Sequence, residues 1–149
     1  MTFTINDFFL DSSVLIEFNK GTKVRHFSSF MSNDLFRCFI NETVISEFLF
    51  HFLAHNGKKS PQSIHSSKQI AEVFENSRQY KLISVCHFLH SDNRIVKMVP
   101  ILMSKYNLLP NDAIILATCK LHNIKQLVSH DTDFILPCKE EGIDLFREE

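Results

Sequence analysis

Five acidic residues in this sequence occupy positions from which their carboxylates could meet and bind a cation. Asp11 follows a short apolar segment, and Asp131 and Asp133 follow a second one. Glu47 and Asp112 lie in the first turns of two segments whose apolar residues have helical spacing. Carboxylates that share one site repel each other, and a cation relieves this repulsion. Mg²⁺ and Mn²⁺ prefer such oxygen ligands and leave positions for phosphate and water, so the pattern indicates a divalent-metal site.

Each of these acids also has a purely structural explanation. Asp11 could cap the helix that follows it, and Asp112 could complement a helix dipole. Glu47 could be a solvated surface charge, and Asp131 and Asp133 could shape a turn. The metal-site interpretation therefore depends on whether the fold brings all five side chains to one place.

Short apolar segments alternate with segments of helical periodicity along most of the chain. Strands are predicted at residues 8–10, 35–40, 81–86, 126–128 and 143–146. Helices are predicted from Ser12 or Ser13 to Gly21, from Thr22 to Asn33, from about Asn41 to Gly57, around 70–74, from Ser91 or Asp92 to Tyr106 with a bend at Pro100, and from Asn111 to His122. Residues 56–67 read as a loop. This alternation predicts an α/β fold with three layers, α/β/α, around a central and mainly parallel sheet.

The predicted fold places the acids at one edge of the sheet. In open parallel sheets the ligand crevice lies beyond the carboxyl ends of the strands, where Asp11, Asp131 and Asp133 are expected. The helix N-termini that carry Glu47 and Asp112 open toward the same edge. With 149 residues and no shift in composition, the chain is expected to form a single domain over residues 1–149.

Composition limits the classes of protein that fit. Sixteen basic residues against seventeen acidic ones give a formal net charge of −1 and no cationic tail for nucleic acid, which does not count against a nuclease that recruits phosphate through metal ions. The four cysteines form no CxxC pair, so a zinc site of the usual spacing is unsupported. No signal peptide and no membrane-length apolar run are visible, which favours a cytoplasmic protein.

Two further features suggest additional sites. His51 and His55 follow Glu47 at intervals of four residues, so a Glu-His-His transition-metal site is geometrically possible, but the favoured interpretation is a polar helix edge near the mouth of the acidic site. The chain also contains 15 Phe, more aromatic surface than one small core needs. We therefore expect a homodimer formed through apolar helix surface, with Phe27, Phe30, Phe50 and Phe52 as candidates.

Four segments that contain these acids, taken in order, closely resemble the PIN-domain family. They are Phe9-Leu10-Asp11-Ser12-Ser13-Val14-Leu15-Ile16, Val44-Ile45-Ser46-Glu47-Phe48, Leu109-Pro110-Asn111-Asp112-Ala113 and Val128-Ser129-His130-Asp131-Thr132-Asp133-Phe134. No single segment is specific, but the ordered set is, and it extends from about Phe8 to Phe146. The nearest resemblance is to VapC-like toxins of bacterial and archaeal toxin–antitoxin pairs, which are small PIN domains that cut RNA.

The resemblance implies a PIN-like fold and a role for each matching residue. The positions that match the family's metal ligands are Asp11, Glu47, Asp112 and Asp131. Asp133 matches an auxiliary acid, and Ser12 and Ser129 match hydroxyls that orient the carboxylates. The implied activity is hydrolysis of RNA phosphodiesters assisted by one or two Mg²⁺ or Mn²⁺ ions. The implied partners are RNA, a small antitoxin protein and a second copy of the chain.

Two other functions remain open at this stage. The chain could be a PIN nuclease with a housekeeping role in RNA maturation, with the same chemistry and no antitoxin. It could also be a catalytically inactive PIN scaffold that binds protein or RNA. The complete set of acids argues against the scaffold, because a domain without catalysis has no reason to keep carboxylates that repel each other.

Overall fold

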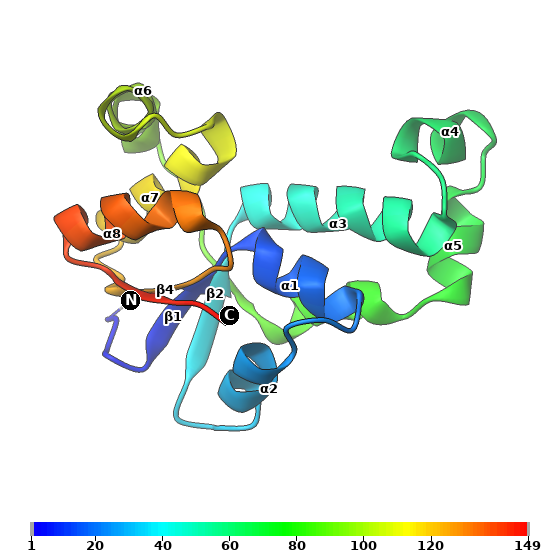
Figure 1. Ribbon diagram of the computed structural model, residues 1–149, viewed down its shortest axis with the longest axis horizontal. Helices are drawn as coiled ribbons and strands as arrows, with labels where there is room; N and C mark the ends of the chain where they lie inside the picture. Colours follow the sequence, from blue (N-terminus) through cyan, green and yellow to red (C-terminus); the bar gives the residue numbers. More distant parts are fainter. Residues whose placement is uncertain (1, 149) are drawn as a thin grey trace.

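The computed structural model describes residues 2–148 and contains a five-stranded sheet in which every pairing is parallel. The strand order is β3-β2-β1-β4-β5 (Figure 1). The strands are β1 (Asp7–Leu10), β2 (Arg37–Ile40), β3 (His87–Phe88), β4 (Gln126–Val128) and β5 (Asp144–Phe146). The predicted α/β fold with a central parallel sheet is therefore confirmed.

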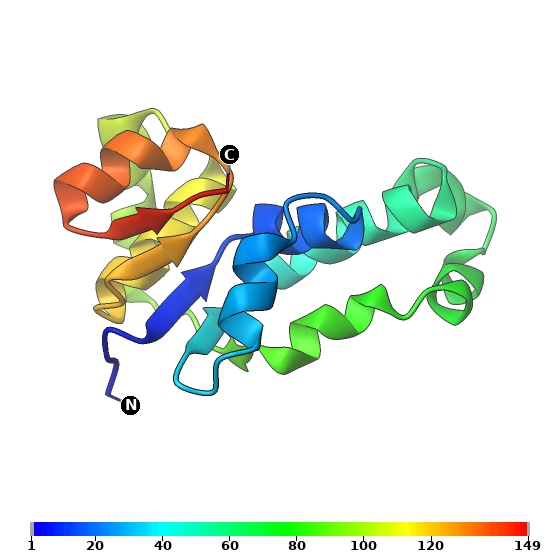
Figure 2. The ribbon, with the colours of Figure 1, turned by 60° about the horizontal axis from the view of Figure 1, so that its bottom comes forward.

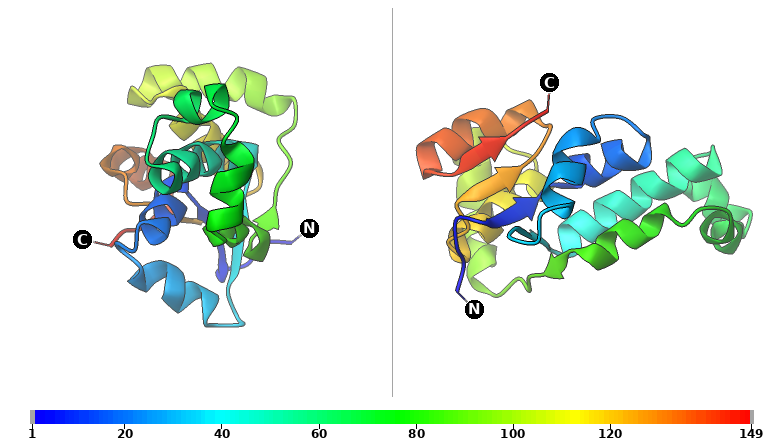
Figure 3. Two further views of the ribbon diagram at one scale, coloured as in Figure 1. Left: turned by 90° about the vertical axis from the view of Figure 1, so that its right-hand side faces the viewer. Right: turned by 90° about the horizontal axis from the view of Figure 1, so that it is seen from below.

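Helices cover both faces of the sheet. They are α1 (Ser12–Asn19), α2 (Arg25–Met31), α3 (Glu42–Gly57), α4 (Pro61–Ser66), α5 (Ile70–Asn76), α6 (Arg94–Tyr106), α7 (Pro110–Leu121) and α8 (Ile135–Glu141). Helices α1 and α2 lie on one face and α7 and α8 on the other, with α6 packed outside α7 (Figures 1 and 2). Helices α3, α4 and α5 extend away from the side of the sheet (Figure 3). No helix among residues 2–148 is both long and apolar enough to cross a bilayer.

Phenylalanine fills much of the core on the α2 face. The Phe8 ring on β1 lies 4.4 Å from the Phe30 ring and 5.9 Å from the Phe146 ring, measured between centroids. Phe27 and Phe52, which were predicted to supply surplus aromatic surface, are only 3% and 0% exposed. These two residues therefore cannot supply a dimer surface, because Phe27 packs against Phe18 of α1 and Phe52 packs against Phe74 of α5 and Tyr80.

The prediction of a strand at residues 81–86 is wrong. Residues Gln79–Val85 form a 3₁₀ helix, and the strand β3 begins only at His87. The Tyr80 ring lies 6.0 Å from Phe52 of α3, and Ile83 packs against the core. The apolar side chains of this segment therefore pack against helix α3 and the core. This tertiary packing overrides their preference for a strand.

The predicted loop at 56–67 is also wrong in part, because it contains helix α4. Ser60 is the N-cap of α4, its hydroxyl accepts a hydrogen bond from the Ser63 backbone N–H at 3.2 Å, and Pro61 occupies the first turn. The Ser-Pro pair is a signature of a helix start rather than of a loop.

Three other helix starts differ from the predictions. The N-cap position of α1 is Asp11 rather than Ser12 or Ser13, and the Asp11 side chain makes no capping hydrogen bond there. Helix α2 begins at Arg25 rather than after Thr22. The N-cap of α6 is Asn93, one or two residues later than the predicted Ser91 or Asp92. Helix starts with several polar candidates are assigned poorly by sequence, because each candidate has a similar capping preference.

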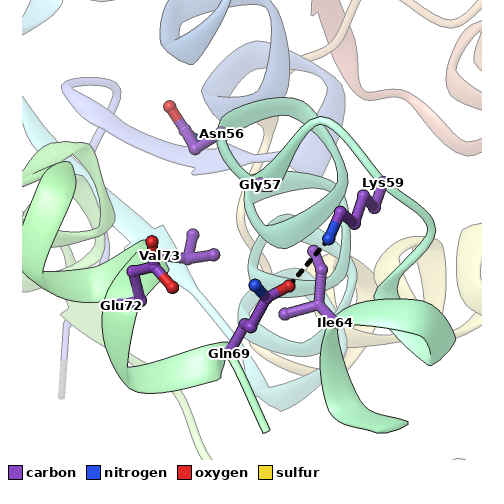
Figure 4. Close-up of a pocket in the computed structure, with 7 residues that line it drawn as sticks. All are labelled: Asn56, Gly57, Lys59, Ile64, Gln69, Glu72 and Val73. Atoms are coloured by element: carbon purple, nitrogen blue, oxygen red, sulfur yellow. Dashed lines mark hydrogen bonds between the residues drawn. The ribbon is translucent and has the colours of Figure 1, made fainter. Parts of the chain in front are cut away.

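The end of α3 is packed closely against α4 and α5 at Gly57. Figure 4 shows Ile64 and Val73 beside Gly57, next to the 2.9 Å hydrogen bond from Lys59 Nζ to Gln69 Oε1. These residues line a small hollow of about 230 Å³. A Cβ atom at Gly57 would lie 2.4 Å from Ile64 Cδ1 and 3.1 Å from Val73 Cγ2. A side chain at position 57 would therefore have to displace the end of the Ile64 side chain.

We predict that Gly57→Ala lowers the free energy of unfolding by about 1 kcal/mol, because overpacking outweighs the gain in helix propensity. Denaturant unfolding measures the change. Ile64→Val removes the Cδ1 atom that the new methyl group meets, so Gly57→Ala should be neutral or favourable in that background. An equal loss in both backgrounds would contradict the proposed contact.

Candidate metal centre

The five acids lie at one edge of the sheet, on four different elements. Asp11 immediately follows β1, and Asp131 and Asp133 follow the neighbouring strand β4. The two strands are in register, with Leu10 beside Val128, and the Asp11 backbone N–H donates to the Val128 carbonyl at 3.0 Å. The carboxyl ends of β1 and β4 therefore leave the sheet side by side and present their acids together.

Two helices bring the other acids to this edge. Asp112 lies in the first turn of α7, which begins at Pro110, and Glu47 lies in the second turn of α3. One side-chain oxygen from each of Asp112, Asp131 and Asp133 lies within 4.8 Å of the others. Glu47, Asp112 and Asp131 also line a groove of about 380 Å³.

The wall of this groove is completed by the start of α7, namely Leu109, Pro110 and Asn111. Asp11 lies beneath the cluster and is only 4% exposed. All five predicted acids thus occupy one neighbourhood, with Asp11 at its base and Asp133 at its exposed side.

Crowding and burial hold these carboxyl groups toward their neutral forms. Burial, followed by the charges of Asp11, Asp131, Glu47 and Asp133, raises the pKa of Asp112 to about 7. Burial and then the charge of Asp11 raise the pKa of Glu47, and burial raises the pKa of Asp11 itself. The repulsion that a cation would relieve is therefore present at this edge.

One oxygen of the cluster lacks a partner. Among the described residues, Glu47 Oε2 is buried and accepts no hydrogen bond. A buried carboxylate oxygen without a donor is uncommon in folded proteins. Together with a donor set made only of carboxylates, this oxygen fits a hard divalent cation such as Mg²⁺ or Mn²⁺.

Two serine hydroxyls fix the orientation of Asp11. Ser13 Oγ donates to Asp11 Oδ2 at 2.6 Å, and Ser129 Oγ donates to the same oxygen at 2.7 Å. Each hydroxyl also accepts a backbone N–H from the chain that leaves β4: His130 donates to Ser13 and Asp131 donates to Ser129, both at 3.0 Å. The serines therefore join Asp11 to the segment that carries Asp131, and Asp11 Oδ1 is left for other ligands.

Ser13 was not predicted as a site residue, whereas Ser12 was. The Ser12 hydroxyl instead acts on Glu47, where it favours the charged form and opposes the rise in the Glu47 pKa. The sequence did contain a signal for Ser13, because it lies two residues after Asp11 at the start of a helix. The first helical turn brings a hydroxyl at that position back toward the acid.

The structural roles considered for the acids also appear in part. Asp131 Oδ1 accepts a hydrogen bond from the Asp133 backbone N–H at 2.9 Å and so shapes the turn after β4. Asp112 lies where it would complement the dipole of α7. Neither role explains the gathering of the acids, because a turn or a helix start needs one carboxylate and not several.

The Glu-His-His arrangement is not formed. Within residues 2–148 the one group of potential ligand atoms gathered this closely is Asp112, Asp131 and Asp133, and the rings of His51 and His55 are exposed. The two histidines therefore form a polar helix edge that leads away from Glu47.

Comparison with known proteins places this arrangement in a family. The PIN-domain family model matches residues 8–139. The chain is 33% identical over 130 residues to Ribonuclease VapC2 of Methanocaldococcus jannaschii, covering 87% of each protein. Its fold is similar to the crystal structure of PAE2754 from Pyrobaculum aerophilum, with a TM-score of 0.60 and 14% identity over 95% of this chain and 84% of that one. It is also similar to a toxin–antitoxin complex from Klebsiella pneumoniae, with a TM-score of 0.55 and 18% identity over 85% and 89%. This chain belongs to the PIN-domain family.

Proposed function

We propose that this protein is a metal-dependent endoribonuclease that hydrolyses RNA phosphodiesters and acts as the toxin of a toxin–antitoxin pair. The observation that carries the proposal is the cluster of carboxylates at the edge formed by β1, β4, α3 and α7. One side-chain oxygen from each of Asp112, Asp131 and Asp133 lies within 4.8 Å of the others, and the Asp112 pKa is raised to about 7. The relationship to Ribonuclease VapC2 supports RNA as the substrate.

Each residue has a proposed role in the site. Mg²⁺ or Mn²⁺ would be held by Asp11, Glu47, Asp112 and Asp131. Asp133 is an auxiliary acid at the exposed side, and Ser12 and Ser129, now joined by Ser13, orient the carboxylates. A metal ion held there would supply Lewis-acid polarisation of the phosphate and would lower the pKa of a water molecule bound to it.

The protein's own contribution to the reaction is to hold the proposed metal ligands in fixed positions. Ser13 and Ser129 hold Asp11 Oδ2, so the carboxylate cannot rotate away from the groove. Asp131 is held by its own turn, through the hydrogen bond from the Asp133 backbone N–H. Fixed ligands need no rearrangement when substrate arrives, which is how a preorganised site accelerates a reaction. Leu109 and Pro110 line the groove beside the acids.

Two protein partners belong to the proposal. The Klebsiella pneumoniae relative in fold is a toxin–antitoxin complex, which supports a small antitoxin as the partner that keeps the acidic groove inactive. A homodimer is also proposed, for which Phe50, 48% exposed, remains a candidate from the residues first considered. Exposed apolar side chains on α6, Val96 at 70% and Ile101 at 64%, offer a surface for it.

We predict that the purified protein cleaves single-stranded RNA with Mg²⁺ or Mn²⁺ and that excess chelator stops the cleavage. The physical reason is that an acidic groove can hold a phosphate only through a bound cation. Gel analysis of a labelled RNA measures the activity. Cleavage that co-purifies with the protein and persists in chelator would overturn the proposal.

A second observation separates the toxin from a housekeeping nuclease. If the protein is a toxin, a short antitoxin encoded beside it should bind it and suppress the metal-dependent cleavage. Metal-dependent cleavage without such a partner would favour RNA maturation. Absence of both metal binding and cleavage would favour the inactive scaffold.

A further inference from the structure

A buried amide bridges the two helices that carry Glu47 and Asp112. Asn41, at the junction of β2 and α3, is 0% exposed, and Thr118 in the middle of α7 is 1% exposed. Asn41 Nδ2 donates to Thr118 Oγ1 at 3.0 Å, and Thr118 Oγ1 donates to the Ile114 carbonyl at 2.8 Å. These bonds form a continuous chain of donors and acceptors between α3 and α7.

The geometry leaves one assignment for the amide. Asn41 Oδ1 accepts the Val44 backbone N–H at 3.1 Å and so caps α3. The amide nitrogen must then face Thr118, whose hydroxyl hydrogen is already used by Ile114 and which can only accept. Capping needs the oxygen alone. The nitrogen therefore performs a second task that the start of α3 does not require.

The two residues of the Asn41–Thr118 hydrogen bond are equally far in sequence from the acids on their helices. Glu47 follows Asn41 by six residues, and Asp112 precedes Thr118 by six. At a rise of about 1.5 Å per residue, each acid is roughly 9 Å along its helix from the bridge. Because helices are stiff over such a length, a fixed point on each helix also fixes how the two carboxylates face each other.

The two acids would otherwise be driven apart. Glu47 and Asp112 belong to a crowded set of like charges, and they lie on separate helices rather than on one rigid strand. Asp11 and Asp131, in contrast, are tied together by serine hydroxyls and by the β1–β4 pairing. Helices α3 and α7 therefore need a separate contact that restrains their relative position. The buried Asn41–Thr118 hydrogen bond is such a contact.

We propose that Asn41 and Thr118 are positioning residues that set the separation of Glu47 and Asp112 for divalent-metal binding. The proposal rests on the proposed function, because it assumes that these acids bind metal. Groups that orient metal ligands from behind typically change metal affinity by about 10- to 100-fold when they are removed.

The test measures Mn²⁺ affinity by calorimetry on folded protein, without RNA. Asn41→Ser keeps an oxygen for the cap but is too short to reach Thr118, and Thr118→Val removes the hydroxyl with little change in shape. Each should raise the dissociation constant for Mn²⁺ by about 10-fold. Thr118→Ser, which keeps the hydroxyl, should bind Mn²⁺ like wild type. Ile64→Val, a buried change in α4 beside the far end of α3, should also bind like wild type.

The outcomes separate the two proposals. Wild-type protein that binds no Mn²⁺ overturns the proposed function and this inference with it. Wild-type binding that is matched by Asn41→Ser and Thr118→Val overturns the inference alone, and their hydrogen bond is then structural. If Thr118→Val does not fold, Asn41→Ser and Thr118→Ser still decide the result, because the first breaks the bridge and the second preserves it.

Discussion

Replacement of Asp112 by asparagine should abolish RNA cleavage and leave the metal-free protein at least as stable as wild type. Asp112 is the acid that its neighbours perturb most clearly, with burial and four other carboxylates raising its pKa to about 7. The amide has nearly the same shape but no charge. It therefore removes a proposed metal ligand and, at the same time, a source of repulsion in the apo protein.

The sign of the pH dependence follows from the raised pKa. The folded-state pKa of Asp112, about 7, lies above its ordinary value of 3.8. Its favourable contribution is therefore fully present below pH 3.8 and is lost as pH rises through about 7. Wild-type apo protein should lose stability over this window, and Asp112→Asn should lose less. Because the groove is open to solvent, we expect an advantage for the variant on the order of 1 kcal/mol at pH 8.

Bound metal should reverse the order of the two proteins. Metal at a hundredfold excess over its dissociation constant adds about 2.7 kcal/mol to the stability of the protein that binds it. Asp112→Asn should lose most of this increment. Melting curves at pH 7.5 for both proteins, in chelator and in excess Mn²⁺, measure the effect together with the RNA assay. Asp34→Asn, at an exposed turn residue between α2 and β2, is the matched control and should behave like wild type throughout.

Two results would contradict this account of Asp112. If the variant melts far below wild type in chelator, the carboxylate is structural, for instance through its place at the start of α7. If wild type gains nothing from Mn²⁺ and cleaves no RNA, the inactive scaffold replaces the nuclease.

The position of the acids could be predicted because it depends on few features of the chain. Asp11 and Asp131 follow strands that are nearly continuous runs of buried apolar residues, and such runs indicate parallel strands. Adjacent parallel strands end at the same edge, so the two acids had to meet if β1 and β4 were neighbours. The PIN-domain resemblance supplied the same residues independently.

The hydrogen bonds that hold the acids could not be predicted in the same way. Ser13 reaches Asp11 only because α1 begins at Ser12, and polar candidates at a helix start are hard to distinguish by sequence. The Asn41–Thr118 contact joins residues 77 positions apart. Periodicity describes the face of one helix and does not describe how two helices pack.

Two of the misassigned segments lie in the same part of the fold. The residues before β3 and the start of α4 lie in the part of the chain that packs on α3, away from the sheet (Figure 3). Leu82 and Ile83 are partly buried against the core in a 3₁₀ helix, where local β preference has no partner strand to satisfy it. Tertiary packing thus decided the segment before β3, whereas α4 begins at a Ser-Pro signal that is local in the sequence and the sheet strands followed their local pattern.

The largest loss of stability is expected from Arg37→Met, at the opposite edge of the sheet from the acids. Asp7 is 1% exposed, and Arg37 donates to both of its oxygens at 2.7 Å. Burial alone would raise the Asp7 pKa, but hydrogen bonds from Arg37 and the Thr4 backbone lower it. Without the guanidinium a buried carboxylate loses its counter-charge. We expect a loss of about 3 kcal/mol, which lowers the melting temperature by roughly 6 to 12 °C.

The Asp92–Arg94 pair provides a matched control and the pH dependence provides a second test. Arg94 also binds its aspartate at 2.6 Å, but the two side chains are 60% and 40% exposed, so Arg94→Met should cost less than about 1 kcal/mol.

The lowered Asp7 pKa means that its contribution is present above the ordinary value of 3.8 and is lost as pH falls through the folded-state pKa. In Arg37→Met the lone buried carboxyl is instead more stable protonated. The difference between wild type and Arg37→Met should therefore shrink as pH approaches 3, as measured by urea unfolding across pH. Two results would contradict this account of the Asp7–Arg37 pair, which aligns β1 with β2. One is an equal loss of stability in Arg37→Met and Arg94→Met. The other is a difference between wild type and Arg37→Met that increases in acid, because either result would show that the burial of Asp7 does not set the strength of the ion pair.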